Sequence, residues 1–252
     1  MSRSCEQALG IGLPAIAFTE HLEFTEGGDG DAIAGVATDA RWWNRIKPLD
    51  LTGYLAALED CRQRYPGLRI LSGVEAGESH LFAASAAAAL RGQPLDRVLG
   101  SLHAVPYQGK LVAADALFGS MPDDEVMRYY FAELLRLIES SGLFEVLAHL
   151  DFPRRFWPKG AHLFREEAFE EEYRTVLRAL ARGGRVLEIN TKSPLASVDL
   201  VRWWHAVGGT AVSFGSDAHL PQRVGDRFKL AVDVVEAAGF RAGHDPYDFW
   251  RR

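Results

Sequence analysis

Histidine and carboxylate side chains stand at the ends of several predicted β-strands in this chain. The set consists of His21, Glu75, His103, His149, Asp217 and His219. Imidazole nitrogen combined with carboxylate oxygen suits Zn²⁺, Mn²⁺ or Fe²⁺. The pattern therefore predicts a metal centre, and several such groups together can hold more than one divalent cation.

Each of these residues also has a structural interpretation when it is taken alone. A histidine at the end of a strand, such as His21, His103 or His149, is more often a hydrogen-bonded structural residue. Glu75 could be a carboxylate at a helix N-terminus, and Asp217 could be an N-cap. The joint pattern favours the metal interpretation, because four histidines and two carboxylates all follow strands.

The elements that would position these residues alternate between short apolar runs and segments of helical periodicity. Strands are predicted over residues 15–18, 69–74, 97–102, 143–148, 185–189 and 210–214, and helices over 51–65, 81–91, 120–140, 166–182, 198–207 and 224–238. Strict alternation favours a parallel sheet, in either a barrel or a doubly wound fold. In a parallel barrel the carboxyl ends of the strands converge on one face, where barrel enzymes place their chemistry.

Length and composition restrict the class of protein. The 252 residues can form one large domain, and no linker or repeat divides them, so we expect residues 1–252 to be a single domain. A net charge of −6 argues against a nucleic-acid surface, and no apolar run is long enough to span a membrane. Two cysteines without a CxxC pair indicate a reducing, cytoplasmic location.

The ordered strand-end segments resemble the polymerase-and-histidinol-phosphatase (PHP) superfamily, and within it the histidinol-phosphatase branch. The similarity extends from about residue 6 to residue 227 and lies in residues 16–21 (IAFTEH), 73–75 (GVE), 100–103 (GSLH), 148–151 (AHLD), 188–191 (EINT) and 215–219 (GSDAH). The ordered set is more specific than any single motif.

This resemblance implies an α/β fold, a distorted seven-stranded (β/α) barrel of the TIM type, with two or three divalent metal ions (Zn, Mn or Fe). It implies metal ligation by His21, Glu75, His103, His149, Asp217 and His219. By the same resemblance, Glu20 and Asp151 would orient the ligand histidines.

One family feature is missing from the sequence. Members of the family begin with a strand that carries a His-x-His pair, and this chain starts in what would be the following helix, near residues 4–10. We therefore expect a barrel without its first strand and a metal cluster without several ligands. Either the sequence starts inside a longer protein, or it is a short form with impaired metal binding.

The expected chemistry is phosphate ester hydrolysis, in which hydroxide held by the metal attacks phosphorus. Asp217 or His149 would assist proton transfer, and the spacing does not choose between them. Arg154, Arg155 and Lys192 are candidates to bind the phosphate, although surface arginine and lysine are common and each is more often an ordinary surface residue.

Three functions remain open at this level. The first is hydrolysis of the small molecule L-histidinol phosphate to L-histidinol and phosphate in histidine biosynthesis. The second is hydrolysis of another small phosphoester or of a nucleic-acid end, and the third is an inactive or weakly active remnant of the fold.

Trp42 and Trp43 lie in a long loop and would form either a lid over a ring-bearing substrate or part of the core. The oligomeric state is left open.

Overall fold

The computed structural model describes residues 1–33, 37–38, 48–160, 162–192 and 194–252. The predicted lid or core role of Trp42 and Trp43 lies outside the described residues and stays a prediction.

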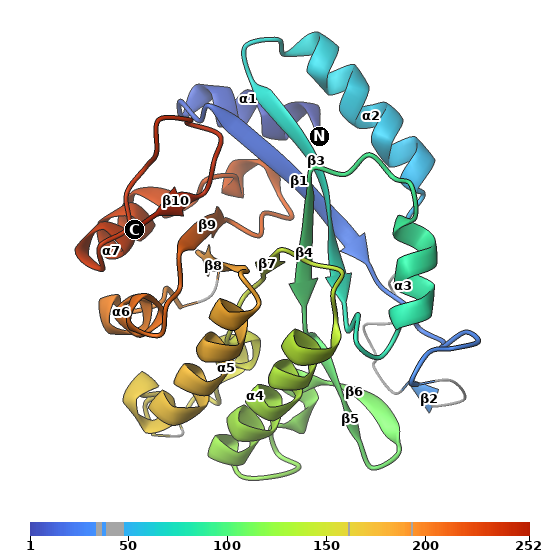
Figure 1. Cartoon of the computed structure of the whole chain (residues 1–252), viewed down its shortest axis with the longest axis vertical. Helices are drawn as coiled ribbons and strands as arrows, with labels where there is room; N and C mark the ends of the chain where they lie inside the picture. The colour runs from blue at the N-terminus through green and yellow to red at the C-terminus, as the bar shows by residue number, and fades with distance from the viewer. Residues whose placement is uncertain (34–36, 39–47, 161, 193) are drawn as a thin grey trace.

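Seven strands form the main sheet, in the order β1-β3-β4-β7-β8-β9-β10 (Figure 1). They are β1 (Ala15–Leu22), β3 (Arg69–Gly77), β4 (Arg97–Ser101), β7 (Val146–Leu147), β8 (Val186–Asn190), β9 (Ala211–Gly215) and β10 (Trp250–Arg251). Strands β1 to β9 of this sheet run parallel, and β10 pairs antiparallel with β9. Each of the six parallel strands overlaps a predicted strand, although β1 extends further than predicted and β7 is shorter, whereas β10 was not predicted.

Seven α-helices accompany these strands in the described part of the chain. They are α1 (Ser2–Gly10), α2 (Leu51–Arg64), α3 (Ala83–Leu90), α4 (Asp123–Ser140), α5 (Glu170–Arg182), α6 (Val198–Ala206) and α7 (Phe228–Ala237). Polar side chains cap the N-termini of α2 and α6. The Asp50 carboxylate accepts from the amide of Gly53 (3.0 Å), and the Ser197 hydroxyl accepts from the amide of Leu200 (3.0 Å). The alternation of strand and helix confirms the predicted α/β fold.

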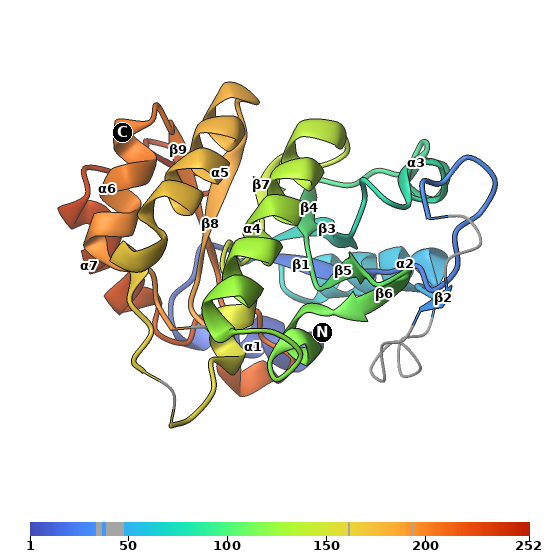
Figure 2. The same ribbon diagram turned by 90° about the horizontal axis from the view of Figure 1, so that it is seen from below.

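The strands form a curved, open sheet with the helices on its outer side (Figures 1 and 2). All residues of β3 except the first are buried, as expected for a parallel strand covered on both faces. Large apolar side chains fill the space between α4, α5, α6 and the sheet, including the fully buried Tyr130, Tyr173 and Trp204. This packing fixes the strands whose carboxyl ends carry the candidate residues.

A second, smaller sheet follows β4. It contains β2 (Ala37–Thr38), β5 (Ala104–Tyr107) and β6 (Lys110–Ala113) in the order β2-β6-β5. The segment predicted as a long loop, residues 104–121, therefore contains a hairpin and the short 3₁₀ helix η2 (Ala114–Leu117). The described residues also contain the 3₁₀ helices η3 (Phe152–Phe156), η4 (Glu166–Phe169) and η5 (Pro221–Arg223).

A cavity of about 810 Å³ lies between β1 and β9. The C-terminal segment lies against the amino ends of β3 and β4, where Arg69 packs over the ring of Tyr247 (5.0 Å) and Arg97 over that of Phe249 (4.6 Å). At the carboxyl ends of the strands the cavity is lined by candidate residues from four strands. Across the described residues, no helix combines the length and apolar character needed to cross a membrane.

Candidate metal centre

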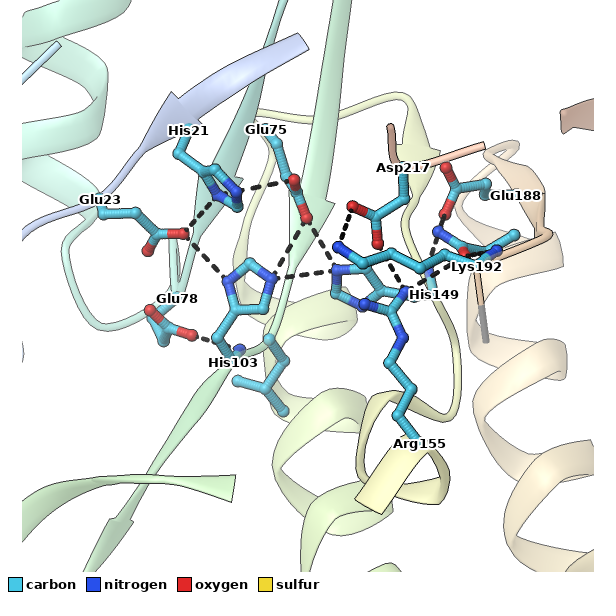
Figure 3. Close-up of polar contacts among 12 residues, drawn as sticks. His21, Glu23, Glu75, Glu78, His103, His149, Arg155, Glu188, Lys192 and Asp217 are labelled. Carbon is cyan, nitrogen blue, oxygen red and sulfur yellow. Dashed lines mark hydrogen bonds and ion pairs between the residues drawn. The ribbon is translucent and has the colours of Figure 1, made fainter. Parts of the chain in front are cut away.

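Four of the predicted ligands are brought together by neighbouring parallel strands (Figure 3). His21 near the end of β1 lies in register with Glu75 in β3, and His103 and His149 follow the ends of β4 and β7. Since β1, β3, β4 and β7 are consecutive in the sheet, their carboxyl ends place these side chains side by side.

Glu75 is the centre of this group. Its Oε1 lies 2.7 Å from Nε2 of His149 and 3.3 Å from Nε2 of His103, and its Oε2 lies 3.6 Å from Nδ1 of His21. The two Nε2 atoms of His103 and His149 face each other at 3.1 Å. Nitrogen and oxygen donors therefore converge on a small buried volume.

A second buried carboxylate, Glu23, was missed by the sequence analysis. Its Oε1 lies 3.1 Å from Nδ1 of His21 and 3.0 Å from Nδ1 of His103. The side chain is 0% exposed, and its Oε2 has no hydrogen-bond partner among the described residues. Gly77 leaves the room for it, since a Cβ at that position would lie 2.0 Å from Glu23 Oε2.

The structure corrects the predicted roles of Glu20 and Asp151. Glu20 is exposed, and neither carboxylate bonds to a histidine within the described part of the chain. Asp151 instead accepts from the hydroxyl of Tyr173 (2.8 Å) and from Arg154 (3.1 Å). Side chains alternate between the faces of a strand, so Glu20 points away from the side that His21 occupies. That alternation, applied beyond the end of β1, is the signal that could have identified Glu23.

Arg154 is also corrected as a candidate phosphate ligand. Its Nη1 lies 2.5 Å from Glu166 Oε1 as well as 3.1 Å from Asp151 Oδ2. These two carboxylates neutralise the guanidinium in a largely buried network. Arg154 therefore stabilises the connection between η3 and η4, and the contacts that the described residues make with it come from Asp151, Glu166 and Phe164.

Asp217 forms the other half of the candidate centre, together with two cations. Its Oδ2 lies 2.7 Å from Nη2 of Arg155, and its Oδ1 lies 2.9 Å from Nζ of Lys192. His219 Nε2 lies 3.1 Å from the same Oδ1, and its ring is 5.6 Å from that of His21. The predicted residues Asp217, His219, Arg155 and Lys192 thus lie together beside the histidine cluster.

Charge and burial shift several pKa values in this cluster. Burial opposes a charge on His103, but the Glu23 and Glu75 carboxylates outweigh burial and hold its pKa well above the usual value. His103 and His149 in turn hold the pKa of Glu75 well below its usual value despite burial. Burial lowers the pKa of His149, and Glu75 only partly compensates. The histidines and glutamates of this cluster are therefore linked by ion pairs.

Asp217 stays ionised for a similar reason. Burial would raise its pKa, but His219, Arg155 and Lys192 together hold the pKa of Asp217 below its ordinary value. Asp217 and His149 also have positive φ angles, +46° and +22°. Non-glycine residues in this region carry strain that the surrounding structure must maintain, and such strain is common in functional sites.

The donor set fits a divalent transition metal. Glu75, His103 and His149 each offer a ligand atom, all within 4.8 Å of one another, and His21, Glu23 and His103 form a second such group. The 3.1 Å approach of two imidazole nitrogens beside a carboxylate is an arrangement that a cation between them would stabilise. His21, Glu75, His149, Asp217 and His219 also line one cavity.

Metal binding is expected to release protons, because a histidine must be neutral to act as a ligand. The raised pKa of His103 favours its protonated form, so zinc must displace a proton from this ring. Below that pKa, we expect the apparent zinc affinity to fall about tenfold for each pH unit and each displaced proton. Zinc calorimetry at one pH in two buffers of different ionisation enthalpy measures the release. Equal heats in both buffers would contradict the expectation.

Known proteins resemble this chain over most of its length. The family model described as PHP domain matches residues 1–192. A probable histidinol-phosphatase from Deinococcus radiodurans is 29% identical to this chain, covering 94% of this chain and 86% of its own length. The histidinol-phosphatase of Lactococcus lactis is 24% identical, covering 93% of this chain and 83% of its own.

Two solved structures share the fold. The histidinol phosphate phosphatase of Lactococcus lactis, crystallised with zinc, L-histidinol and phosphate, has a TM-score of 0.78 and 23% identity, covering 95% of this chain and 87% of that one. The putative histidinol phosphatase of Listeria monocytogenes has a TM-score of 0.74 and 18% identity, covering 91% and 92%. The match of the family model to most of the chain confirms the resemblance seen in the sequence: the chain belongs to the PHP domain family.

Proposed function

We propose that this chain is a metal-dependent phosphomonoesterase that hydrolyses L-histidinol phosphate to L-histidinol and phosphate. The observation that carries the proposal is the convergence of His103, His149 and Glu75 on one point, with Arg155 and Lys192 beside it. The similarity to histidinol-phosphatases over most of the chain supports this substrate. Zinc, histidinol and phosphate are bound in the Lactococcus structure that shares the fold.

Different residues of the chain would bind the metal and orient its ligands in such a reaction. His21, Glu75, His103 and His149 would hold the metal, together with Asp217 and His219. A bound divalent cation acts as a Lewis acid towards a phosphoryl oxygen and makes a water nucleophile accessible near neutral pH. Glu23 would orient the rings of His21 and His103 by accepting from their Nδ1 atoms.

The structure favours Asp217 over His149 for handling protons. His149 is 3% exposed, its Nε2 faces Glu75 and His103, and its Nδ1 is buried. Both residues line the cavity, but the Asp217 side chain is more exposed (12% against 2% for His149) and stays ionised, so its oxygens can accept a hydrogen bond from an attacking water. We therefore assign the orientation of the nucleophile to Asp217 and a purely metal-binding role to His149.

Arg155 and Lys192 would bind the phosphoryl oxygens. Both currently donate to the Asp217 carboxylate, which holds them at the edge of the metal-ligand cluster. A phosphate offers the same kind of anionic oxygen, and charge-assisted hydrogen bonds of this type are the strong ones. Arg155 also packs over the ring of Phe152 (5.1 Å), which limits the orientations of its guanidinium.

We expect Arg155→Ala to reduce kcat/KM for histidinol phosphate by about thirtyfold, equivalent to about 2 kcal/mol for a lost charged hydrogen bond. The adjacent Arg154→Ala is the matched control. Its guanidinium is held by Asp151 and Glu166, so its loss should lower stability and leave KM unchanged. Steady-state kinetics with thermal unfolding of both variants measures the difference. Equal kinetic effects would remove the distinction between the two arginines.

The substrate is tested with purified protein loaded with Zn²⁺ or Mn²⁺ and a panel of phosphoesters. The proposal predicts the highest kcat/KM for histidinol phosphate among small phosphomonoesters, and little activity on nucleic-acid ends. If another phosphomonoester were preferred, the proposed substrate would be wrong and the proposed reaction, hydrolysis of a phosphomonoester, would stand. If the metal-loaded protein turned over no member of the panel, the proposal that this chain is an enzyme would be rejected.

We also propose that residues 1–252 form one domain, because strands from residue 15 to residue 251 belong to a single sheet. The two cysteines, Cys5 and Cys61, are free thiols, which supports a reducing cytoplasmic location.

A further inference from the structure

Two buried glutamates that none of the roles above uses, Glu78 and Glu188, bind the main chain of metal-ligand histidines. We infer that Glu78 and Glu188 are positioning residues, which fix His103 and His149 through hydrogen bonds to their main-chain amides. The inference deepens the proposed function and rests on it for the role of the two histidines.

Glu78 lies directly after β3 and reaches across to the end of β4. Its Oε1 accepts from the amide of His103 (2.6 Å) and from that of Ala104 (2.9 Å). The Glu78 amide itself donates to the carbonyl of Ser101 (3.0 Å), which continues the ladder between β3 and β4. Glu78 is 0% exposed and has a φ of +44°, so its main chain turns out of the strand at this residue.

Glu188 repeats this arrangement between β8 and β7. Its Oε2 accepts from the amide of His149 (2.7 Å) and from the side-chain amide of Asn190 (3.0 Å) (Figure 3). The side chain lies against Gly215, where a Cβ would come within 1.8 Å of Glu188 Oε1. Glycine at 215 therefore leaves the space that the carboxylate occupies.

The two carboxylates accept hydrogen bonds from main-chain amides that lie beyond the ends of the strands. His103 and His149 lie beyond the last residues of β4 and β7, and His149 has left the extended conformation with φ +22°. A buried amide without an acceptor is destabilising, so each histidine needs a partner there. A carboxylate from the adjacent strand supplies it, and fixing the amide also fixes the direction of the Cα–Cβ bond that carries the imidazole.

A positioning role requires a side chain at 78 and at 188 that is long enough to reach the amide and carries an acceptor oxygen. Glutamine has the same length and an acceptor oxygen, so it can keep the amide bonds. Aspartate keeps the charge but is one methylene shorter, so its oxygen cannot reach the amide at the same place. A role as a metal ligand or as a source of negative charge demands the reverse order, with aspartate better than glutamine.

The test measures zinc affinity of the full chain by competition with a chromophoric chelator, for Glu78→Gln, Glu78→Asp, Glu188→Gln and Glu188→Asp. We expect the aspartate variants to lose about ten- to a hundredfold in affinity, the usual effect of removing a group that orients a ligand. The glutamine variants should bind zinc like the wild type. The control is Glu133→Asp. Glu133 is a buried glutamate on helix α4 that bonds to His80 (2.8 Å), so this variant should lose stability and keep the zinc affinity of the wild type.

Loss of zinc affinity in the glutamine variants, or full affinity in the aspartate variants, would overturn the inference. If an aspartate variant does not fold, a loss of zinc affinity in the corresponding glutamine variant would still overturn the inference. Failure of the proposed function is distinguishable: the wild type would bind zinc but not hydrolyse histidinol phosphate, and the order of affinities would still be measured.

Discussion

Replacing His149 with alanine is expected to reduce kcat for histidinol phosphate by about a thousandfold or more, since metal ions contribute several kcal/mol of transition-state stabilisation. His149 Nε2 lies at the point where Glu75 and His103 also converge. Its removal takes one donor from a buried cluster and leaves the Glu75 carboxylate with one partner fewer. The fold should persist, because the His149 ring belongs to the site and not to the apolar core.

The experiment combines turnover, zinc content and thermal unfolding of the purified variant. His80→Ala is the control, since His80 is a largely buried histidine that bonds to Glu133 away from the cluster. It should lose stability while it keeps kcat and zinc. If His149→Ala retained both zinc and turnover, the ligand assignment of His149 would be wrong.

Replacing Asp217 is expected to reduce kcat/KM by about a hundred- to a thousandfold, comparable to losing a group that stabilises the transition state directly. The loss has two causes. Asp217→Ala removes a predicted metal ligand, and it releases Arg155 and Lys192, whose cationic groups lie 2.7 Å and 2.9 Å from its oxygens. Asp217→Asn keeps the size but lacks the charge, so we expect it to be nearly as impaired as the alanine variant.

Asp199→Ala provides the matched control for Asp217. Asp199 is an exposed carboxylate in the first turn of α6, and it bonds to Arg202 on the same helix. Its substitution should leave kcat/KM unchanged. Wild-type turnover in Asp217→Asn would show that the negative charge of this residue is not needed, and the roles proposed for it would have to be abandoned.

Much of the scaffold was predictable from the sequence because its signals are local. Apolar runs ending at His21, Glu75, His103 and His149 predicted strands, and the strands form a parallel sheet in the described residues. Parallel strands place their carboxyl ends at one edge, so the meeting of these side chains followed from topology alone.

What was not predictable depends on contacts between distant segments. Arg154 and Arg155 are adjacent in the sequence, but Arg154 is bound by Glu166 and Arg155 by Asp217, and nothing local distinguishes them. Glu23 fits beside His103 only because Gly77, far along the chain, leaves the space. Strand β10 is two residues long and is defined by its pairing with β9, so it has no periodicity to detect.

The most direct test of the metal centre is anomalous diffraction at the zinc edge from crystals of the zinc-loaded protein. The account predicts a peak at about 2.0–2.2 Å from Nε2 of His103, Nε2 of His149 and a carboxylate oxygen of Glu75. The account would be contradicted if protein that hydrolyses histidinol phosphate bound zinc elsewhere. In that case these three side chains would be bonded only to one another.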